Sequence, residues 1–263
     1  MKRVNQIITA LKGRARRWLA NRLPYSNIRT DEWHVERREG NNIIKGTAIG
    51  FSYTDKDRIL VPGMLKSFYF AEFVVSYYDS AERKSFDFDE SERHKAIIRK
   101  ARQAGAKYFW GVGPKRRISK ETIQSIRENM YLVKEGHLII TKYRYPWGKD
   151  LKNIRTDGVY GRRYTSAFFP ILKTNQYSRK PLHHRWHPRN LPKKHLDCIQ
   201  YHLGRNSEEV VKKKFEFYKS QEYKSKFWKS LEIKDLVPDK IEISPINEKI
   251  LGIGWRERHF KDW

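Results

Sequence analysis

The sequence predicts an α/β protein in which a mostly parallel sheet is flanked by helices. Between residues 43 and 130, short apolar segments typical of strands alternate with helical segments, and this order implies right-handed crossovers between parallel strands. The chain of 263 residues also contains 8 Trp, 15 Tyr and 13 Phe, which supply the apolar surface that a disordered chain lacks. The sequence holds no run of about 18 apolar residues, so it predicts no helix that spans a bilayer.

Three buried strands and one short helix come first. Apolar runs predict strands at 43–51, 72–78 and 108–112. Between the first two, a short helix is expected at 59–68, with an interruption near Pro62 and Gly63.

Two longer helices follow the second and third strands. The segment 90–104 has an apolar face and ends before Gly105, and the segment 120–130 begins after Ser119, a residue suited to an N-cap. Ligands of parallel sheets bind beyond the carboxyl ends of the strands. We therefore expect the loops at 52–58, 79–89 and 113–118 to share one rim.

The second half of the chain is less regular. A strand is predicted at 138–140, followed by aromatic and basic loop sequence to about residue 195. A further strand is expected at 196–203, then a helix or helix pair at 208–229 and an irregular tail. Cys198, the single cysteine, lies in the strand pattern and is expected to be an inert core thiol.

The N-terminal residues 1–24 form a separate basic segment without an acidic residue. Apolar residues recur at helical spacing beside Trp18, which favours an amphipathic helix on an anionic membrane surface. A targeting peptide and a helix packed on its own domain are equally compatible with the pattern. We expect a cytoplasmic protein, with peripheral attachment to a membrane through this segment as an alternative.

The charge predicts an anionic partner. Lys and Arg number 56 against 30 Asp and Glu, a net charge of +26. Nucleic acid, a lipid headgroup surface and a phosphorylated small molecule all satisfy such a balance, and charge alone does not choose among them.

Five segments, in their order and spacing, resemble one family. They are GTAIGFSYTDKDRILVPGMLKSF (46–68), AEFVVSYYDS (71–80), FDFDESERHKAIIRKARQAGAKYFWGVGPKRRIS (86–119), LHHRWHPRNLP (182–192) and LDCIQYHLGRNSEEVVKKKFEFY (196–218). Together they resemble the family 2-type glycosyltransferases of the GT-A fold, which transfer sugars from nucleotide-sugar donors to acceptors. The resemblance implies a Rossmann-type GT-A-like domain at 27–205, preceded by the basic helix at 1–26 and followed by a basic helical or irregular extension at 206–263.

The resemblance also implies donor-binding residues. Thr54 and Asp55 match the polar pair that contacts the nucleotide base, and Asp79 matches the acid at the end of the second strand, with Tyr77 as an alternative. Arg93 matches the family's helical arginine, which suits a diphosphate because a guanidinium binds oxyanions bidentately. A surface pairing of Arg93 with Glu90 is the alternative.

The family's Asp-x-Asp motif is missing. Its aspartates hold Mn²⁺ or Mg²⁺, and here residues 113–117 read Gly-Pro-Lys-Arg-Arg. Because neither Gly113 nor Lys115 ligates a hard cation, we expect no Mn²⁺ or Mg²⁺. Either Lys115, Arg116 and Arg117 stabilise the departing diphosphate directly, or the fold has lost donor chemistry.

The acceptor half offers one base and four platform residues. Asp157 is the candidate base for the acceptor hydroxyl, and its alternative role is to shape the turn before Gly158. Candidates for a sugar or acceptor platform are Trp147, Trp186, His184 and His202. In the resembling family a histidine of this region completes the metal site or contacts the diphosphate. The spacing of the histidines here matches no metal motif, so no ligand is assigned.

The sequence thus supports two functions. The first is a glycosyltransferase, active without the usual metal, that uses a nucleotide-sugar and an acceptor of unknown kind. The alternative is a non-catalytic protein on the same fold that binds nucleic acid or takes part in an assembly.

Overall fold

The computed structural model describes residues 33–79, 90–177, 186–220, 232–238 and 240–254. The chain divides into two compact units, Met1–Trp33 and His34–Trp263, and the second contains the fold described below. The helix predicted at 1–26, His184 and the end of the helix predicted at 208–229 lie outside the described residues. The division of the chain at 26 and 205 stays a prediction.

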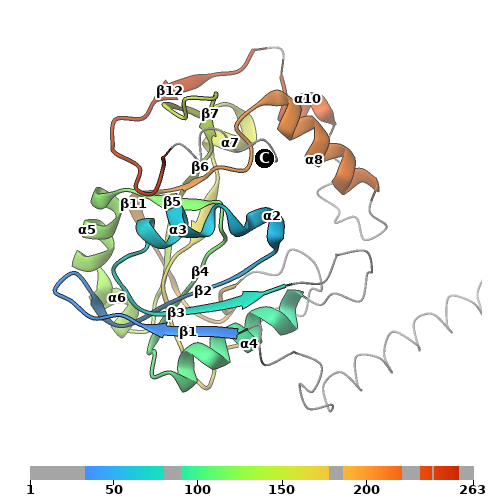
Figure 1. The fold of residues 1–263 in the computed structure, drawn as a ribbon. Coiled ribbons are helices and arrows are strands. Elements are labelled where there is room, and N and C mark those ends of the chain that lie inside the picture. Colours follow the sequence, from blue (N-terminus) through green and yellow to red (C-terminus); the bar gives the residue numbers. More distant parts are fainter. Residues whose placement is uncertain (1–32, 80–89, 178–185, 221–231, 239, 255–263) are drawn as a thin grey trace, which may run out of the picture. The chain divides into compact units, whose positions relative to one another are not determined.

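The first sheet has five strands in the order β1-β3-β2-β4-β10 (Figure 1). They are β1 (Trp33–Arg37), β2 (Ile44–Tyr53), β3 (Ala71–Tyr78), β4 (Tyr108–Gly111) and β10 (Phe169–Pro170). β2 pairs in parallel with both β3 and β4, which confirms the three predicted strands and their direction. β10 joins β4 antiparallel, so the sheet has mixed orientation.

The second sheet has the order β5-β11-β6-β9. It contains β5 (Arg116–Ile118), β11 (Lys193–His202), β6 (Leu138–Arg144) and β9 (Tyr164–Ser166). β11 is parallel to β6 and antiparallel to β5, and β9 is antiparallel to β6. The α/β class is confirmed. A mostly parallel sheet is not, because each of these two sheets contains antiparallel strand pairs beside the parallel ones.

A third, small sheet has the order β12-β8-β7. It consists of β12 (Ile243–Pro245), β8 (Asn153–Arg155) and β7 (Pro146–Trp147), joined antiparallel. The sequence analysis expected loop or irregular chain at all three segments and at β9 and α7 (Gly158–Gly161). Two- and three-residue strands contain no alternation long enough to detect, and they form here because distant segments pair.

The longer helices follow the predicted order, but a four-residue helix at 55–58 lies in a predicted loop and a separate helix at 130–134 follows the one predicted at 120–130. The helices are α2 (Asp55–Arg58), α3 (Val61–Ser67), α4 (Glu90–Gln103), α5 (Lys120–Glu128), α6 (Met130–Lys134), α8 (Glu208–Ser220) and α10 (Ile233–Leu236). Pro62 stands in the first turn of α3, where its missing N–H costs no hydrogen bond, so it starts the helix instead of interrupting it. The helix predicted at 120–130 ends at Asn129, whose side chain donates to the Ser125 carbonyl. The predicted cap is confirmed, because Ser119 Oγ accepts from the Thr122 amide at 3.1 Å.

One aromatic core joins the first sheet to the helices and to β5. Trp110 of β4 is fully buried and contacts Phe68 and Phe168 edge-on, with ring centroids 5.0 and 5.1 Å apart. Ile118 of β5 and Ile126 of α5 belong to the same cluster. The two larger sheets are therefore fixed relative to one another by apolar packing.

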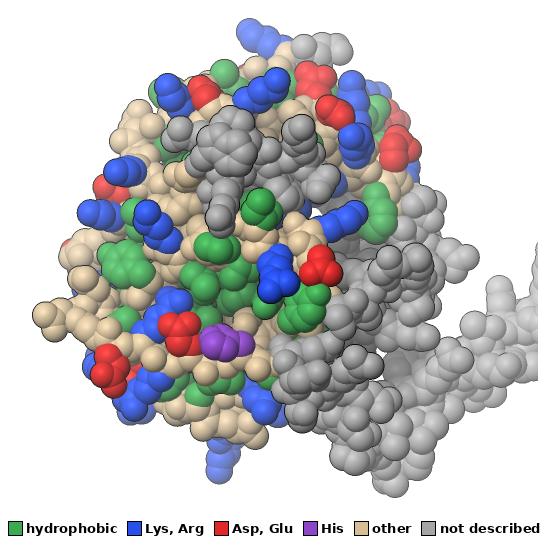
Figure 2. All heavy atoms as spheres, in the orientation of Figure 1, with side chains coloured by type: hydrophobic (Ala, Val, Ile, Leu, Met, Phe, Trp, Pro, Cys, Tyr) green, Lys and Arg blue, Asp and Glu red, His purple; other side chains and the backbone are tan. Residues whose placement is uncertain are grey.

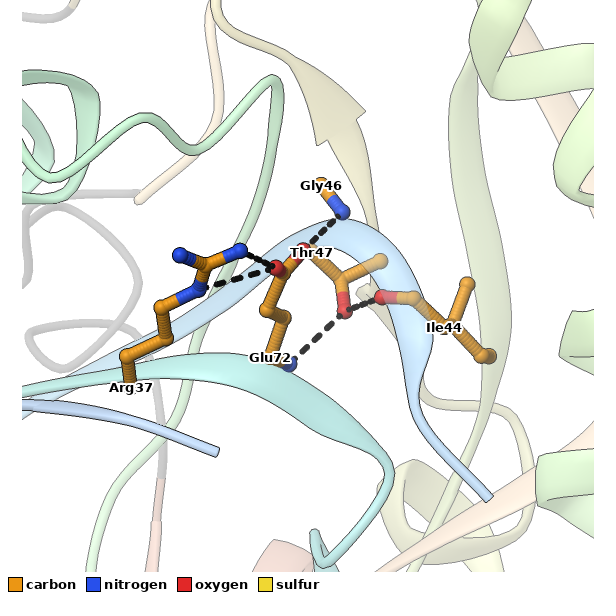
Figure 3. A network of polar contacts seen from close by, with 5 residues as sticks. All are labelled: Arg37, Ile44, Gly46, Thr47 and Glu72. Carbon is orange, nitrogen blue, oxygen red and sulfur yellow. Dashed lines mark hydrogen bonds and ion pairs between the residues drawn. The ribbon is translucent and has the colours of Figure 1, made fainter. Parts of the chain in front are cut away.

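Polar contacts around Glu72 hold the three strands of one sheet edge together (Figure 3). The buried Glu72 carboxylate of β3 accepts hydrogen bonds from the Gly46 amide at 2.6 Å and from Arg37 of β1 at 3.0 Å. Thr47 Oγ1 accepts from the Glu72 amide and donates to the Ile44 carbonyl. These contacts satisfy the backbone where the β2–β3 register shifts between Ile44 and Ala48.

The Glu72 network predicts an acid-sensitive contribution to stability. Burial opposes the charge of Glu72, but the hydrogen bonds from Gly46 and Arg37 outweigh it and lower the pKa of the carboxyl. The contribution is therefore complete at neutral pH and is lost as the pH falls below about 4. Glu72→Gln is expected to lower the free energy of unfolding by about 1–3 kcal/mol at pH 7, and by less at pH 3.5, in urea titrations. Glu39→Gln, at an exposed position, is the control, and a difference that does not change with pH would contradict the assignment.

Candidate functional site

The loops that follow β2, β3 and β4 meet at one edge of the first sheet. α2 begins directly after β2, and the Asp79 amide, just beyond β3, donates to the Tyr53 carbonyl at 2.8 Å. The Tyr78 hydroxyl donates to Asp55 at 2.7 Å. Lys115, in the loop after β4, forms an ion pair with Asp57 of α2 at 3.7 Å. The described parts of the predicted rim, which are residues 52–58, Asp79 and 113–115, therefore meet as expected, and α2 contacts both Tyr78 and Lys115. Residues 80–89 lie outside the described residues, and Arg116–Ile118 forms β5 instead of a loop.

The predicted base-contacting residues lie along this rim. Thr54 is the N-cap of α2, and its side chain makes no capping hydrogen bond. Asp55 lies next to it and accepts from Tyr78. Asp79 is buried and accepts from Arg93 of α4 at 2.8 Å. Arg93, also buried, thus pairs with Asp79 and ties the end of β3 to α4.

The three consecutive basic residues after β4 do not act as one group. Lys115 faces α2, whereas Arg116 lies over the Tyr143 ring at 4.1 Å and donates to Gln200 at 2.9 Å. Arg117 is fully buried and donates to four backbone carbonyls. Those carbonyls belong to Pro114, Arg116, Leu60 and Gly252. A guanidinium held in this way is structural, and we no longer assign Arg117 to the ligand.

Four basic side chains gather around the end of β11, and we call them the cation cluster. They are Lys115, Arg116, Arg205 and Lys214. His202, the last residue of β11, sits among them with its ring 5.5 Å from that of Tyr145, and its Nδ1 accepts from the Gly204 amide at 3.1 Å. Burial first, and then the four cations, hold the pKa of His202 well below its ordinary value. His202 is therefore neutral at pH 7.

Lys214 of α8 and Arg205 are the two members of this cluster that the sequence does not predict as site residues. The Lys214 amine donates to the Gly204 carbonyl. Burial, Lys115 and Arg205 lower the pKa of Lys214 to about 7, and Asp57 acts in the opposite direction. A Cβ on Gly204 would lie 2.5 Å from the His202 ring and 2.9 Å from Lys214 Nζ. Glycine at this position is what lets the two side chains approach the turn.

The residues of the rim do not fit a divalent cation. At the position of the Asp-x-Asp motif, Gly113 and the cation cluster replace the expected carboxylate ligands. The nearby carboxylate of Asp57 pairs with Lys115. Within the described ranges, no group of three or more His, Cys, Asp or Glu side chains is arranged to hold a metal. Ammonium and guanidinium groups repel Mg²⁺ and attract anions. The charged groups at this position are mostly cations, with Asp57 as their carboxylate neighbour.

Asp157 is held by a buried arginine. Its two carboxylate oxygens accept from the Arg155 guanidinium, and it precedes α7 as the N-cap residue. Arg155 is fully buried, donates to the Leu236 carbonyl of α10 at 2.8 Å, and lies over the Tyr160 ring at 4.0 Å. The alternative role of Asp157, shaping the turn, therefore agrees with the geometry, and we no longer assign it as the base.

The predicted platform residues that the structure describes, Trp147, Trp186 and His202, do not form one surface. Trp186 stacks on His94 of α4 at 3.5 Å and covers Gly111, the last residue of β4, so it lies next to the rim. Trp147 lies under Arg155 at 4.7 Å in the third sheet. His202 belongs to the cation cluster. Cys198 is buried, and burial raises the pKa of its thiol to about 11, as expected for an inert side chain.

Comparisons of sequence add no relationship: no protein-family model matches the chain, and no curated protein matches it. Among the helices in the described part of the chain, none has the length and apolar content needed to cross a bilayer.

The structural assignment of Arg117 predicts a loss of stability. Arg117→Met would remove the guanidinium donor from four carbonyls, of which the Leu60 carbonyl keeps the Met64 amide as a second donor. We expect the free energy of unfolding in urea to fall by about 3 kcal/mol or more. The exposed Arg102 provides the control, since Arg102→Met should change it by no more than about 0.5 kcal/mol. If the two variants were equally stable, the structural assignment would be wrong and Arg117 would again be a candidate ligand contact.

Proposed function

We propose that the protein is a family 2-type glycosyltransferase that transfers a sugar from a nucleoside-diphosphate sugar, with side-chain cations in place of a divalent metal. The resemblance of five ordered segments supports the reaction class. The observation on which the proposal depends is the contact of Lys115 with α2, because it joins the rim of three parallel strands to the cation cluster.

The rim offers separate environments for the two parts of such a donor. Asp55 lies on α2 close to the end of β3, where the resemblance assigns contacts to the nucleotide base together with Thr54 and Asp79. The cation cluster contacts α2 at Asp57, through Lys115, and would receive the diphosphate.

The chemistry required of these residues is charge stabilisation. In the transfer, the acceptor oxygen forms a bond to the anomeric carbon, and the bond from that carbon to the phosphate oxygen breaks. The electron pair leaves with the diphosphate, and the acceptor proton passes to a base. Fixed cations next to the leaving oxygen stabilise the developing charge most in a site with little water.

On the face seen in Figure 2, the distribution of surface charge does not favour binding of an extended nucleic acid. There, Lys and Arg side chains are spread over the described surface, with Asp and Glu side chains among them. A phosphate backbone is bound by cations that follow a continuous path. The concentration of cations around His202, where burial is high, fits a small anion better.

The proposal predicts binding of nucleoside diphosphates that does not need a metal. We expect isothermal titration calorimetry with UDP, GDP and ADP to show saturable binding of one of the three. The affinity for that nucleotide should be the same with and without EDTA. Lys115→Asp should weaken it by roughly tenfold or more, because it reverses a charge at the diphosphate.

Lys107→Asp is the matched control, since Lys107 is exposed and lies before the opposite end of β4. Lack of binding at millimolar nucleotide and nucleotide-sugar would overturn the proposal. If polynucleotide binding with a steep dependence on salt accompanied that result, the alternative function would replace it.

A further inference from the structure

We propose that Lys214 is a diphosphate-binding residue and that its protonated amine supplies the charge that a divalent cation supplies in metal-dependent enzymes of this type. The identity of the ligand rests on the proposed function, whereas the position of Lys214 and its surroundings come from the structure. Nothing in the resembling motifs assigns this lysine.

The position of Lys214 on α8 separates it from its neighbours in sequence. Lys212 and Lys213 lie on the exposed side of the helix and pair with Glu208 and Glu209, four residues earlier. The residue four positions before Lys214 is Val210, which is buried. Lys214 therefore projects from the buried side of the helix, where surface ion pairing of that kind does not occur.

The surroundings of Lys214 are positive. Among the described residues, the charged groups that act on it are Lys115 from the loop after β4, Arg205 from the turn after β11, and Asp57 from α2. His202 lies beside it and is neutral. Among these groups, the carboxylate of Asp57 is paired with Lys115, and the three cations are Lys115, Arg205 and Lys214 itself.

Such an arrangement disfavours the charged amine in the absence of an anion. Removal from water and two like charges both oppose protonation, and one carbonyl acceptor does not compensate for them. An apolar side chain would be more stable at this position. A bound diphosphate would reverse the balance, because its oxygens would accept from the amine and offset the repulsion.

The same surroundings make the site responsive to pH. With its pKa at about 7, the Lys214 amine is half protonated at neutral pH, and it is almost entirely neutral at pH 8.5. A diphosphate that binds the charged form should therefore bind more weakly as the pH rises from 6.5 to 8.5. The decrease should be roughly tenfold or more, since apparent affinity follows the fraction of competent protein. His202 stays neutral over this range and does not contribute.

The test uses inorganic pyrophosphate as the probe, titrated calorimetrically into the full chain at pH 6.5 and 8.5. We expect Lys214→Met to weaken binding by roughly tenfold or more at pH 6.5, and to remove the additional pH dependence of the unaltered protein. The titration of pyrophosphate itself cancels in this comparison. The melting temperature of the ligand-free variant should be equal or higher, which a purely structural lysine would not produce.

Lys213→Met is the matched control, because Lys213 is exposed on the same helix and pairs with Glu209. It should leave both the affinity and its pH dependence unchanged. If the methionine variant fails to fold, Lys214→Arg serves instead: a guanidinium stays charged at pH 8.5, so its binding should keep only the pH dependence that comes from pyrophosphate itself.

The outcomes separate this inference from the proposed function. Equal pyrophosphate affinity in Lys214→Met and the unaltered protein, or no pyrophosphate binding at all, overturns the role of Lys214 even if nucleotides bind. Binding of pyrophosphate that depends on Lys214, in a protein that binds no nucleotide or nucleotide-sugar, supports the anion site and removes the glycosyltransferase proposal.

Discussion

The parallel pairing of β2 with both β3 and β4 determines where the rim residues Asp55, Asp79 and Lys115 lie. Parallel strands end at the same edge, so the segments after Tyr53, Tyr78 and Gly111 emerge together. α2 fills the space between them and contacts the neighbouring loops through Asp55 and Asp57. Without this pairing, residues far apart in the sequence would have no reason to form one rim.

The site has a surplus of positive charge in a partly buried place. Proteins usually pair or neutralise buried cations, because desolvation opposes charge. Here burial and the neighbouring cations lower the pKa values of His202 and Lys214, while Asp57 pairs with Lys115 and acts in the opposite direction on Lys214. A bound diphosphate, as proposed above, would offset this repulsion.

Two buried arginines show that basic residues in this chain also have structural uses. Arg117 donates hydrogen bonds to four backbone carbonyls where β5, α3 and the segment near Gly252 meet. Arg155 joins the carboxylate of Asp157 to the end of α10. The sequence assigns Arg117 to the ligand, because a charged residue within a motif looks the same whether its partner is a ligand or a carbonyl.

The sequence alone determined the α/β class, the strands β2, β3 and β4, the cap at Ser119 and the common rim. Each of these depends on local periodicity or on the direction of consecutive strands, which the chain specifies over a few tens of residues. The tertiary structure decided which cations meet. The short antiparallel strands, the burial of Arg117 and Arg155, and the approach of Lys214 to His202 all join segments far apart in the chain. Burial and pairing set the charge and role of such groups, and neither is determined by the neighbours in sequence.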